Sequence, residues 1–319
     1  MPDVCVIGET NLDLILYGLP KEMTLDREHL ANGLAFTLGS SSAIFAHNLS
    51  ILGTKVGFVS RIGPDPLGPM ALERLSAAGV DVGEVKRGTS KTATGLTVVL
   101  PQRQQRYILT YPGAMFEMQF SDINMSYVRK AKHMHLSSFF LHRALRPRMV
   151  ELFRQAKAAG LSTSLDTNDD PENKWDTDLL DVLKHVDIFF PNDREAKKIA
   201  RSEDFSRALN TLASLVKLLV VKRGSSASIC RSGDQQWSLT PPTVKPVDDV
   251  GAGDSFNAGF IHMYLKGTSP EECLAFANIV GAYSTTKEGG TEAFRDRPAL
   301  VSFARQHWHA AGKSTLPIQ

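Results

Sequence analysis

Two carboxylates enclose a run of small residues at 248–256, where the sequence reads Asp-Asp-Val-Gly-Ala-Gly-Asp-Ser-Phe. Apolar residues with helical spacing follow, which predicts a tight turn that leads into a helix. The first N–H groups of a helix have no partner within the helix and lie at its positive end, so such a turn can bind an anion. Asp254 lies in the predicted first turn and could accept a proton from a hydroxyl while a phosphoryl group is held nearby. This pattern favours phosphoryl transfer to an alcohol.

The same segment allows a purely structural interpretation. Gly-Ala-Gly can be a packing turn, and Asp is a common residue at the start of a helix without any chemical role. Both interpretations stay open on residues 248–256 alone, because short motifs occur often by chance.

Composition excludes several classes of function. The 319 residues are 42% hydrophobic and 22% charged, which is enough for a large core. Lys and Arg total 36 against 34 Asp and Glu, a net charge of +2, so we expect no nucleic-acid or membrane partner. No apolar stretch has transmembrane length, and residues 1–8 resemble a strand more than a signal peptide. With Cys5, Cys230 and Cys273 predicted to be buried thiols, we expect a cytoplasmic protein.

Predicted strands alternate with predicted helices along most of the chain. The strands are expected at 4–8, 56–60, 133–137, 162–165, 188–190 and 218–222, and the helices at 40–52, 70–78, 148–159, 195–200, 256–265 and 270–286. This order predicts an α/β fold with a mostly parallel sheet that binds ligands at the carboxyl ends of its strands. Residues 1–319 are expected to form one domain, with a small β-sheet lid from segments at about 10–38 and 90–113. His133 and His135 alternate on a predicted strand, and we expect core or edge histidines there.

Three motifs in order carry a resemblance to a known family. The turn at 248–254 matches Asp-Thr-x-Gly-Ala-Gly-Asp except that Asp249 replaces Thr; residues 39–43, Gly53 and 63–68 resemble an N-terminal glycine-rich signature; and 192–195 matches Asn-x-x-Glu. From Gly8 to about Gly290 the chain resembles the ribokinase-like (PfkB) carbohydrate kinases. Three motifs in register, each after a predicted strand, are more specific than any one alone. The resemblance implies a three-layer αβα ribokinase-like fold.

The resemblance also implies roles on the nucleotide side. Asp254 would be the general base, and the turn of Gly251, Ala252 and Gly253 would form the anion hole with the Asp254 N–H. The implied ATP-binding residues are Asn192, Lys222, Gly224, Gly251, Gly253 and Asn278. Glu195 would hold Mg²⁺, through water, and Asp248 and Val250 would contribute oxygens to a K⁺ site. Asn192 and Glu195 also form a helix-capping pattern that requires no metal, and both roles can hold at once.

The sugar side matches the family less well. The implied substrate-binding residues are Asn11, Asp13, Gly39, Ser40, Ser41, Arg106 and Asp254. A carboxylate such as Asp13 can accept two neighbouring hydroxyls. Ile44 stands where the family has a sugar-binding Asn, and Asp170 stands where many members have Arg.

We therefore predict an ATP-dependent sugar kinase that transfers the γ-phosphoryl group to a hydroxyl, a primary one, of a small carbohydrate. Two alternatives stay open: a kinase of a nucleoside or of a sugar acid such as 2-keto-3-deoxygluconate, and a catalytically weak sugar-binding regulatory protein. Because exposed edges of the lid strands need covering, we also expect a homodimer in which two lids pair.

Overall fold

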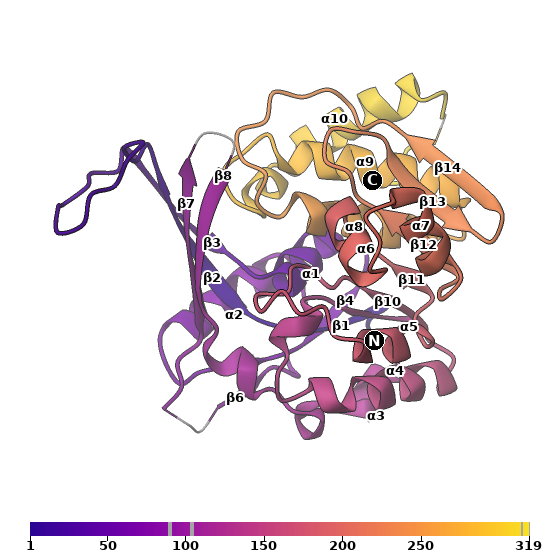
Figure 1. Cartoon of the computed structure of the whole chain (residues 1–319), viewed down its shortest axis with the longest axis horizontal. Helices are drawn as coiled ribbons and strands as arrows, with labels where there is room; N and C mark the ends of the chain where they lie inside the picture. Colours follow the sequence, from indigo (N-terminus) through magenta and orange to yellow (C-terminus); the bar gives the residue numbers. More distant parts are fainter. Residues whose placement is uncertain (89–90, 103–104, 314, 319) are drawn as a thin grey trace.

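The computed structural model describes residues 1–88, 91–102, 105–313 and 315–318. Within these residues, an eight-stranded sheet has the order β14-β13-β12-β11-β10-β9-β1-β4 (Figure 1). Its strands are β1 (Val4–Ile7), β4 (Val56–Val59), β9 (His133–Leu136), β10 (Ser162–Leu165), β11 (Ile188–Phe189), β12 (Leu218–Val221), β13 (Ser228–Ser232) and β14 (Gln235–Leu239). All neighbours pair in parallel except β12–β13 and β13–β14.

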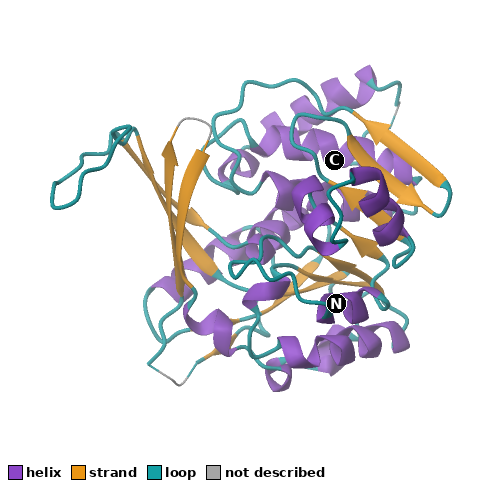
Figure 2. Ribbon diagram, viewed as in Figure 1, coloured by secondary structure: helices purple, strands orange, loops and turns teal. Residues whose placement is uncertain are grey.

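Helices cover both faces of this sheet (Figure 2). On one face lie α1 (Ser41–Ile51), α2 (Leu67–Ala77), α8 (Ala252–Tyr264), α9 (Pro270–Ser284) and α10 (Arg297–Ala310). On the other lie α3 (Met125–Val128), α4 (Met149–Ala158), α5 (Asp178–Leu183), α6 (Asp193–Ile199) and α7 (Phe205–Ala213).

Strands such as β1 and β12 are apolar on both sides because each side faces a layer of helices. In β1, Val4 and Val6 belong to one core, and Cys5 and Ile7 belong to the other. The predicted α/β fold, with three layers and a mostly parallel sheet, is confirmed.

A second, four-stranded sheet has the order β3-β2-β7-β8 and stands beside the main body, at the left of Figure 1. It consists of β2 (Asn11–Tyr17), β3 (Gly33–Leu38), β7 (Gly95–Gln102) and β8 (Gln105–Tyr111). A two-stranded sheet pairs β5 (Arg61–Ile62) with β6 (Lys86–Arg87). The short 3-10 helices are η1 (Gly113–Glu117), η2 (Phe120–Asp122), η3 (Phe139–Leu141), η4 (Arg146–Arg148) and η5 (Glu292–Arg295).

Some elements differ from the sequence prediction for identifiable reasons. Helix α8 begins at Ala252, before the apolar run at 256–265, because its first turn consists of small and acidic residues. The sequence did not predict α5, because six residues are too few to produce a helical period. It did not predict β14 either, because this edge strand is largely polar. None of the helices in the described part of the chain is long and apolar enough to cross a membrane.

Candidate active site

The turn before α8 leaves backbone donors free. Gly251 has a φ of 72°, in the left-handed region that favours glycine, and it precedes the helix directly. The Ala252 N–H donates to the Asp249 carbonyl at 3.2 Å, whereas the N–H groups of Gly253 and Asp254 have no acceptor among the described residues. A Cβ on Gly251 would lie 2.7 Å from the Gly290 Cα, so the neighbouring loop requires glycine here. The two free donors lie at the positive end of α8, where an anion is favoured.

Asp254 adds a carboxylate to these donors. It accepts a hydrogen bond from the Ser41 hydroxyl, which comes from the first turn of α1. Burial raises the pKa of Asp254 to about 7, and the charges of Asp166 and Glu9 act in the same direction. The Ser41 hydrogen bond and the Lys222 charge lower it in part. A carboxyl group with a pKa near 7 exchanges protons readily at neutral pH.

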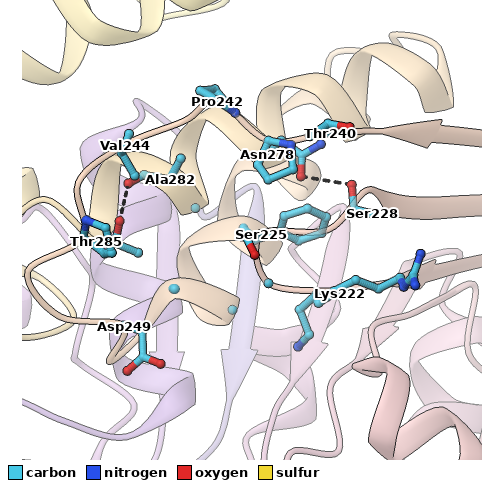
Figure 3. A pocket seen from close by; sticks show the side chains of 18 of the residues that line it. Lys222, Ser225, Ser228, Thr240, Pro242, Val244, Asp249, Asn278, Ala282 and Thr285 are labelled. Atoms are coloured by element: carbon cyan, nitrogen blue, oxygen red, sulfur yellow. Dashed lines mark hydrogen bonds between the residues drawn. The ribbon is translucent and has the colours of Figure 1, made fainter. Parts of the chain in front are cut away.

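A pocket of about 440 Å³ lies beside this turn, between the end of β12 and helices α8 and α9 (Figure 3). Four of the predicted ATP-binding residues line it, namely Lys222, Gly224, Gly253 and Asn278. Apolar lining comes from Pro241, Pro242, Val244, Phe256 and Ala282. Asp249 and Lys222 lie toward one end of the pocket and Asn278 toward the other (Figure 3).

Asn278 has a structural contact in addition to its place in the pocket. Its amide donates to the Leu239 carbonyl at 2.9 Å and accepts from the Ser228 hydroxyl at 2.9 Å, the bond drawn in Figure 3. These bonds connect α9 to β13 and to the end of β14.

Lys222 forms an ion pair with Asp166, whose side chain is fully buried. The Asn257 amide donates to the same carboxylate at 2.6 Å. Burial lowers the pKa of Lys222, but the carboxylates of Asp166 and Glu195 outweigh this effect and raise it. Sequence reasoning missed both Asp166 and Asn257 as site residues. A polar residue directly after a buried parallel strand, as Asp166 is after β10, was the signal available for it.

Asn192 and Glu195 form the capping pattern at the start of α6. Both oxygens of Glu195 accept from Asn192, from the N–H at 2.8 Å and from the amide at 2.6 Å. The Glu195 N–H donates in return to Asn192 Oδ1 at 2.8 Å. Burial raises the pKa of Glu195 to about 7, although the Lys222 charge opposes it. Among the described residues that line the pocket, neither Asn192 nor Glu195 appears.

Asn11, Asp13 and Gly39 lie together where the small sheet meets α1. A Cβ on Gly39 would overlap the Asp13 carboxylate and lie 2.8 Å from Asn11 Oδ1. Asp13 is 5% exposed; burial raises its pKa to about 7, the Asp248 charge adds to this, and Arg106 opposes it. Within the described residues, neither the Asp13 carboxylate nor Asn11 Oδ1 has a hydrogen-bond donor. The pair therefore offers unused acceptors, which suit hydroxyl groups.

Ser40 and Ser41 start α1. Ser40 has a φ of 63°, and its hydroxyl accepts from the Ala43 N–H at 3.2 Å and donates to the Glu9 carbonyl at 2.8 Å. The Ser41 hydroxyl donates to Asp254, so the glycine-rich segment at the start of α1 and the first turn of α8 meet through this residue.

Two of the departures from the family pattern have structural roles. Ile44 is buried and packs against two glycines. A Cβ on Gly251 would lie 3.0 Å from Ile44 Cγ2, and a Cβ on Gly290 would lie 2.5 Å from Ile44 Cδ1. Asp170 accepts from the N–H groups of Glu172, Lys174 and Trp175 and so organises the loop after β10.

The small sheet contacts the turn before α8 through two successive aspartates, Asp248 and Asp249. The hydroxyl of Tyr17 in β2 donates to Asp248 at 3.0 Å, and Arg106 in β8 forms an ion pair with Asp249. Asp248 also accepts from the N–H groups of Gly289 at 2.9 Å and Val250 at 3.0 Å. Arg106, predicted to bind substrate, thus contacts the residue that replaces the family threonine.

The chain is similar in sequence and fold to known carbohydrate kinases. The model of the pfkB family of carbohydrate kinases matches residues 1–297. An Archaeoglobus fulgidus protein named as an uncharacterized sugar kinase is 31% identical over 250 residues, which cover 76% of this chain and 96% of that protein. The 2-dehydro-3-deoxygluconokinase of Bacillus subtilis is 25% identical over 308 residues, which cover 92% of this chain and 95% of that protein. The solved ribokinase of Arabidopsis thaliana, complexed with ribose and ATP, has a TM-score of 0.79 and 26% identity, and the match covers 95% of this chain and 98% of that chain.

The chain therefore belongs to the pfkB family of carbohydrate kinases. It is an ATP-dependent sugar kinase, a phosphotransferase with an alcohol group as acceptor, and the predictions of family and enzyme class are confirmed. The names of its relatives refer to different sugars, so membership of the family does not identify the substrate.

Proposed function

We propose that this kinase transfers the γ-phosphoryl group of ATP to a primary hydroxyl of a small neutral sugar, with Asp254 as the general base. The observation that carries the proposal is the Asp254 carboxylate, with a pKa of about 7, next to the free N–H groups of Gly253 and Asp254. As the sugar oxygen attacks the γ-phosphorus, Asp254 takes the hydroxyl proton and the bond to the ADP oxygen breaks. The free N–H groups of Gly253 and Asp254, at the end of the turn Gly251–Ala252–Gly253, would stabilise the charge on the transferred group.

ATP would occupy the pocket beside the turn. Its base would lie toward Asn278 and the apolar residues, and its phosphates toward Lys222, Gly224 and Gly253. The nearby Lys222, paired with Asp166, is held in place to face these phosphates.

Magnesium and potassium fit two groups of oxygen atoms. Mg²⁺ on ATP phosphates keeps several waters, so Glu195, whose oxygens are already bonded to Asn192, would meet it through water. When bound, Mg²⁺ supplies positive charge to the phosphates. K⁺ would take oxygens of Asp248 and Val250, next to the Gly289 loop. A rate that does not change when N-methylglucamine replaces K⁺ would remove the potassium site.

Sugar hydroxyls would donate to Asp13 and to Asn11 Oδ1, with Gly39, Ser40 and Ser41 forming the adjacent wall. These acceptors favour a neutral sugar over a sugar acid, since Arg106, a cation near Asp13, is already paired with Asp249. The nucleoside kinase and the weakly catalytic sugar-binding protein are the alternatives that the experiment below separates.

The small sheet would act as the lid over the sugar and as the dimer contact. Its edge strand β8 exposes Tyr107, Ile108, Leu109 and Tyr111, each more than half exposed, which supports pairing of two lids. A monomer at micromolar concentration in light scattering would contradict the dimer. The free, buried thiols of Cys5, Cys230 and Cys273 support a cytoplasmic location.

The experiment that tests the function measures ADP release with ATP and Mg²⁺ across neutral sugars, 2-keto-3-deoxygluconate and nucleosides. We expect turnover with a neutral sugar and a loss of roughly 10²- to 10⁴-fold in kcat in Asp254→Asn. Turnover with only the sugar acid or only a nucleoside would show that the substrate belongs to that class and is not a neutral sugar. Sugar binding without turnover would support the regulatory protein, and wild-type turnover in Asp254→Asn would refute the general base.

A further inference from the structure

Glu9 is a buried carboxylate at the active-site end of the sheet, directly after β1, and the reaction described above does not use it. Its side chain is 2% exposed. Oε1 accepts from the Ser42 N–H at 3.1 Å and from the Ser138 hydroxyl at 2.8 Å. Oε2 accepts from the Ser42 hydroxyl at 2.7 Å and lies 3.3 Å from His142 Nε2. A buried carboxylate is costly unless it is bonded in this way, so its environment is built to keep it ionised.

These contacts fix the start of α1. Glu9 holds Ser42 through both its N–H and its hydroxyl, and the Glu9 carbonyl accepts from the Ser40 hydroxyl at 2.8 Å. Ser40 has the left-handed φ of 63°, which is unfavourable for a residue with a side chain and persists only under external constraint. A Cβ on Gly8 would overlap the Ser42 side chain, so the end of β1 and the start of α1 fit together without spare space.

Ser41 lies between the two serines that Glu9 holds. With Ser40 and Ser42 both fixed, the backbone of Ser41 has no freedom to shift, and its hydroxyl meets the Asp254 carboxylate. We propose that Glu9, with His142, is a positioning residue for phosphoryl transfer that acts through Ser41 on the general base Asp254. This inference rests on the proposed role of Asp254.

The charges around the carboxylates of Glu9 and Asp254 support a coupling between these two residues. Burial alone would raise the pKa of Glu9, but the hydrogen bond and charge of His142 and the Ser42 hydrogen bond lower it to about 2. Glu9 is therefore ionised at neutral pH. Asp254 faces Asp166 and Glu9, which raise its pKa, and Ser41 and Lys222, which lower it. Removing the Glu9 charge thus lowers the pKa of Asp254, and removing the Ser41 hydroxyl raises it.

The test is a double-mutant cycle with the full-length kinase and its sugar. Glu9→Gln keeps a hydrogen-bonding amide of the same shape, and Ser41→Ala removes the contact to Asp254. We expect each single variant to lower kcat by roughly 10- to 100-fold. In the Ser41→Ala background, Glu9→Gln should lower kcat less than threefold further, because both changes disrupt the same contact. The control is Glu272→Gln. The Glu272 carboxylate also accepts hydrogen bonds at the start of a helix, from Ser269 before α9, but it is remote from Asp254, so this variant should keep the wild-type kcat.

The pH profile separates positioning from a merely structural role. Loss of the Ser41 hydrogen bond raises the pKa of Asp254 more than loss of the Glu9 charge lowers it. The acid limb of kcat/KM should therefore move to higher pH in both Ser41→Ala and Glu9→Gln. Fully additive losses in kcat, or an acid limb that stays in place or moves to lower pH in folded Glu9→Gln, would overturn the inference. If Glu9→Gln does not fold, Ser42→Ala removes one bond to Glu9, and its non-additivity with Ser41→Ala tests the same coupling. Wild-type activity in Asp254→Asn would instead refute the proposed function, so the two failures are distinguishable.

Discussion

Gly39→Ala tests whether Asp13 and Asn11 form the sugar site. The added Cβ would lie closer than 3.0 Å to both side chains, a separation that real Cβ atoms do not show, and would overlap the Asp13 carboxylate itself. Asp13 is buried and has to move away, which takes its two oxygens out of position. Loss of one or two hydrogen bonds to a charged group costs about 3 kcal/mol, or roughly 100-fold in sugar affinity.

We expect kcat/KM for the sugar to fall roughly 100-fold, mainly through KM, while KM for ATP changes less than about twofold. Gly33→Ala is the matched control at the start of β3, the strand that Gly39 follows, because its Cβ would meet Tyr17 at an ordinary 3.4 Å. In an Asp13→Ala background the carboxylate is already gone, so Gly39→Ala should add less than about threefold. The assay is steady-state ADP release with the sugar and ATP varied in turn. A folded Gly39→Ala with wild-type KM for the sugar, or full additivity with Asp13→Ala, would refute the reasoning.

Three further predictions concern charge, acid stability and assembly. Asp249→Thr removes a carboxylate from the proposed ATP pocket and should lower KM for ATP by roughly 3-fold at low salt. An unchanged or higher KM for ATP would contradict this. Burial lowers the pKa of His133 to about 3, so its contribution to stability is complete above pH 6.5 and is lost as the pH falls toward 3. In urea unfolding, the free energy of unfolding falls between pH 7.5 and 5.0, and this fall should be about 2 kcal/mol smaller in His133→Gln than in the wild type. An equal fall in both proteins would argue against this role of His133. Leu109→Lys places a charge on the exposed edge strand β8 and should yield monomers in light scattering, whereas an unchanged dimer would locate the contact elsewhere.

The sequence predicted those parts of the fold that depend on periodic burial. Strands such as 218–221 are apolar on both faces because two helical layers cover them, and glycines after the helices mark where these end. The parallel sheet and the motif positions at its carboxyl edge followed from that pattern. The histidines His133 and His135 lie in the core as expected, where serines bond all four ring nitrogens at 2.7 to 2.9 Å.

Pairings between distant segments could not be read in the same way. Ser41 and Asp254 are 213 positions apart, and Arg106 and Asp249 are 143 apart, so no local spacing brings them together. Glu9 gave no signal because a glutamate after a strand is usually exposed. Only the tertiary structure reveals the three hydrogen bonds and the His142 contact of its carboxylate. The family motifs predicted Asp254 as the general base, and the side chains that shift its pKa, such as Ser41 and Lys222, come from segments outside the turn.

These pairings suggest why the chain tolerates Asp249 where the family has threonine. An extra carboxylate at the phosphate end of the pocket would repel ATP, yet Arg106 from β8 neutralises it. The neighbouring Asp248 accepts a hydrogen bond from Tyr17 in β2, so both aspartates connect the small sheet to the turn before α8. If the small sheet opened, Arg106 would move away and the Asp249 charge would act on bound ATP. If the sheet closed, Arg106 would neutralise that charge again. Sugar and ATP binding would be coupled through this pair of contacts, since each depends on where the same sheet lies.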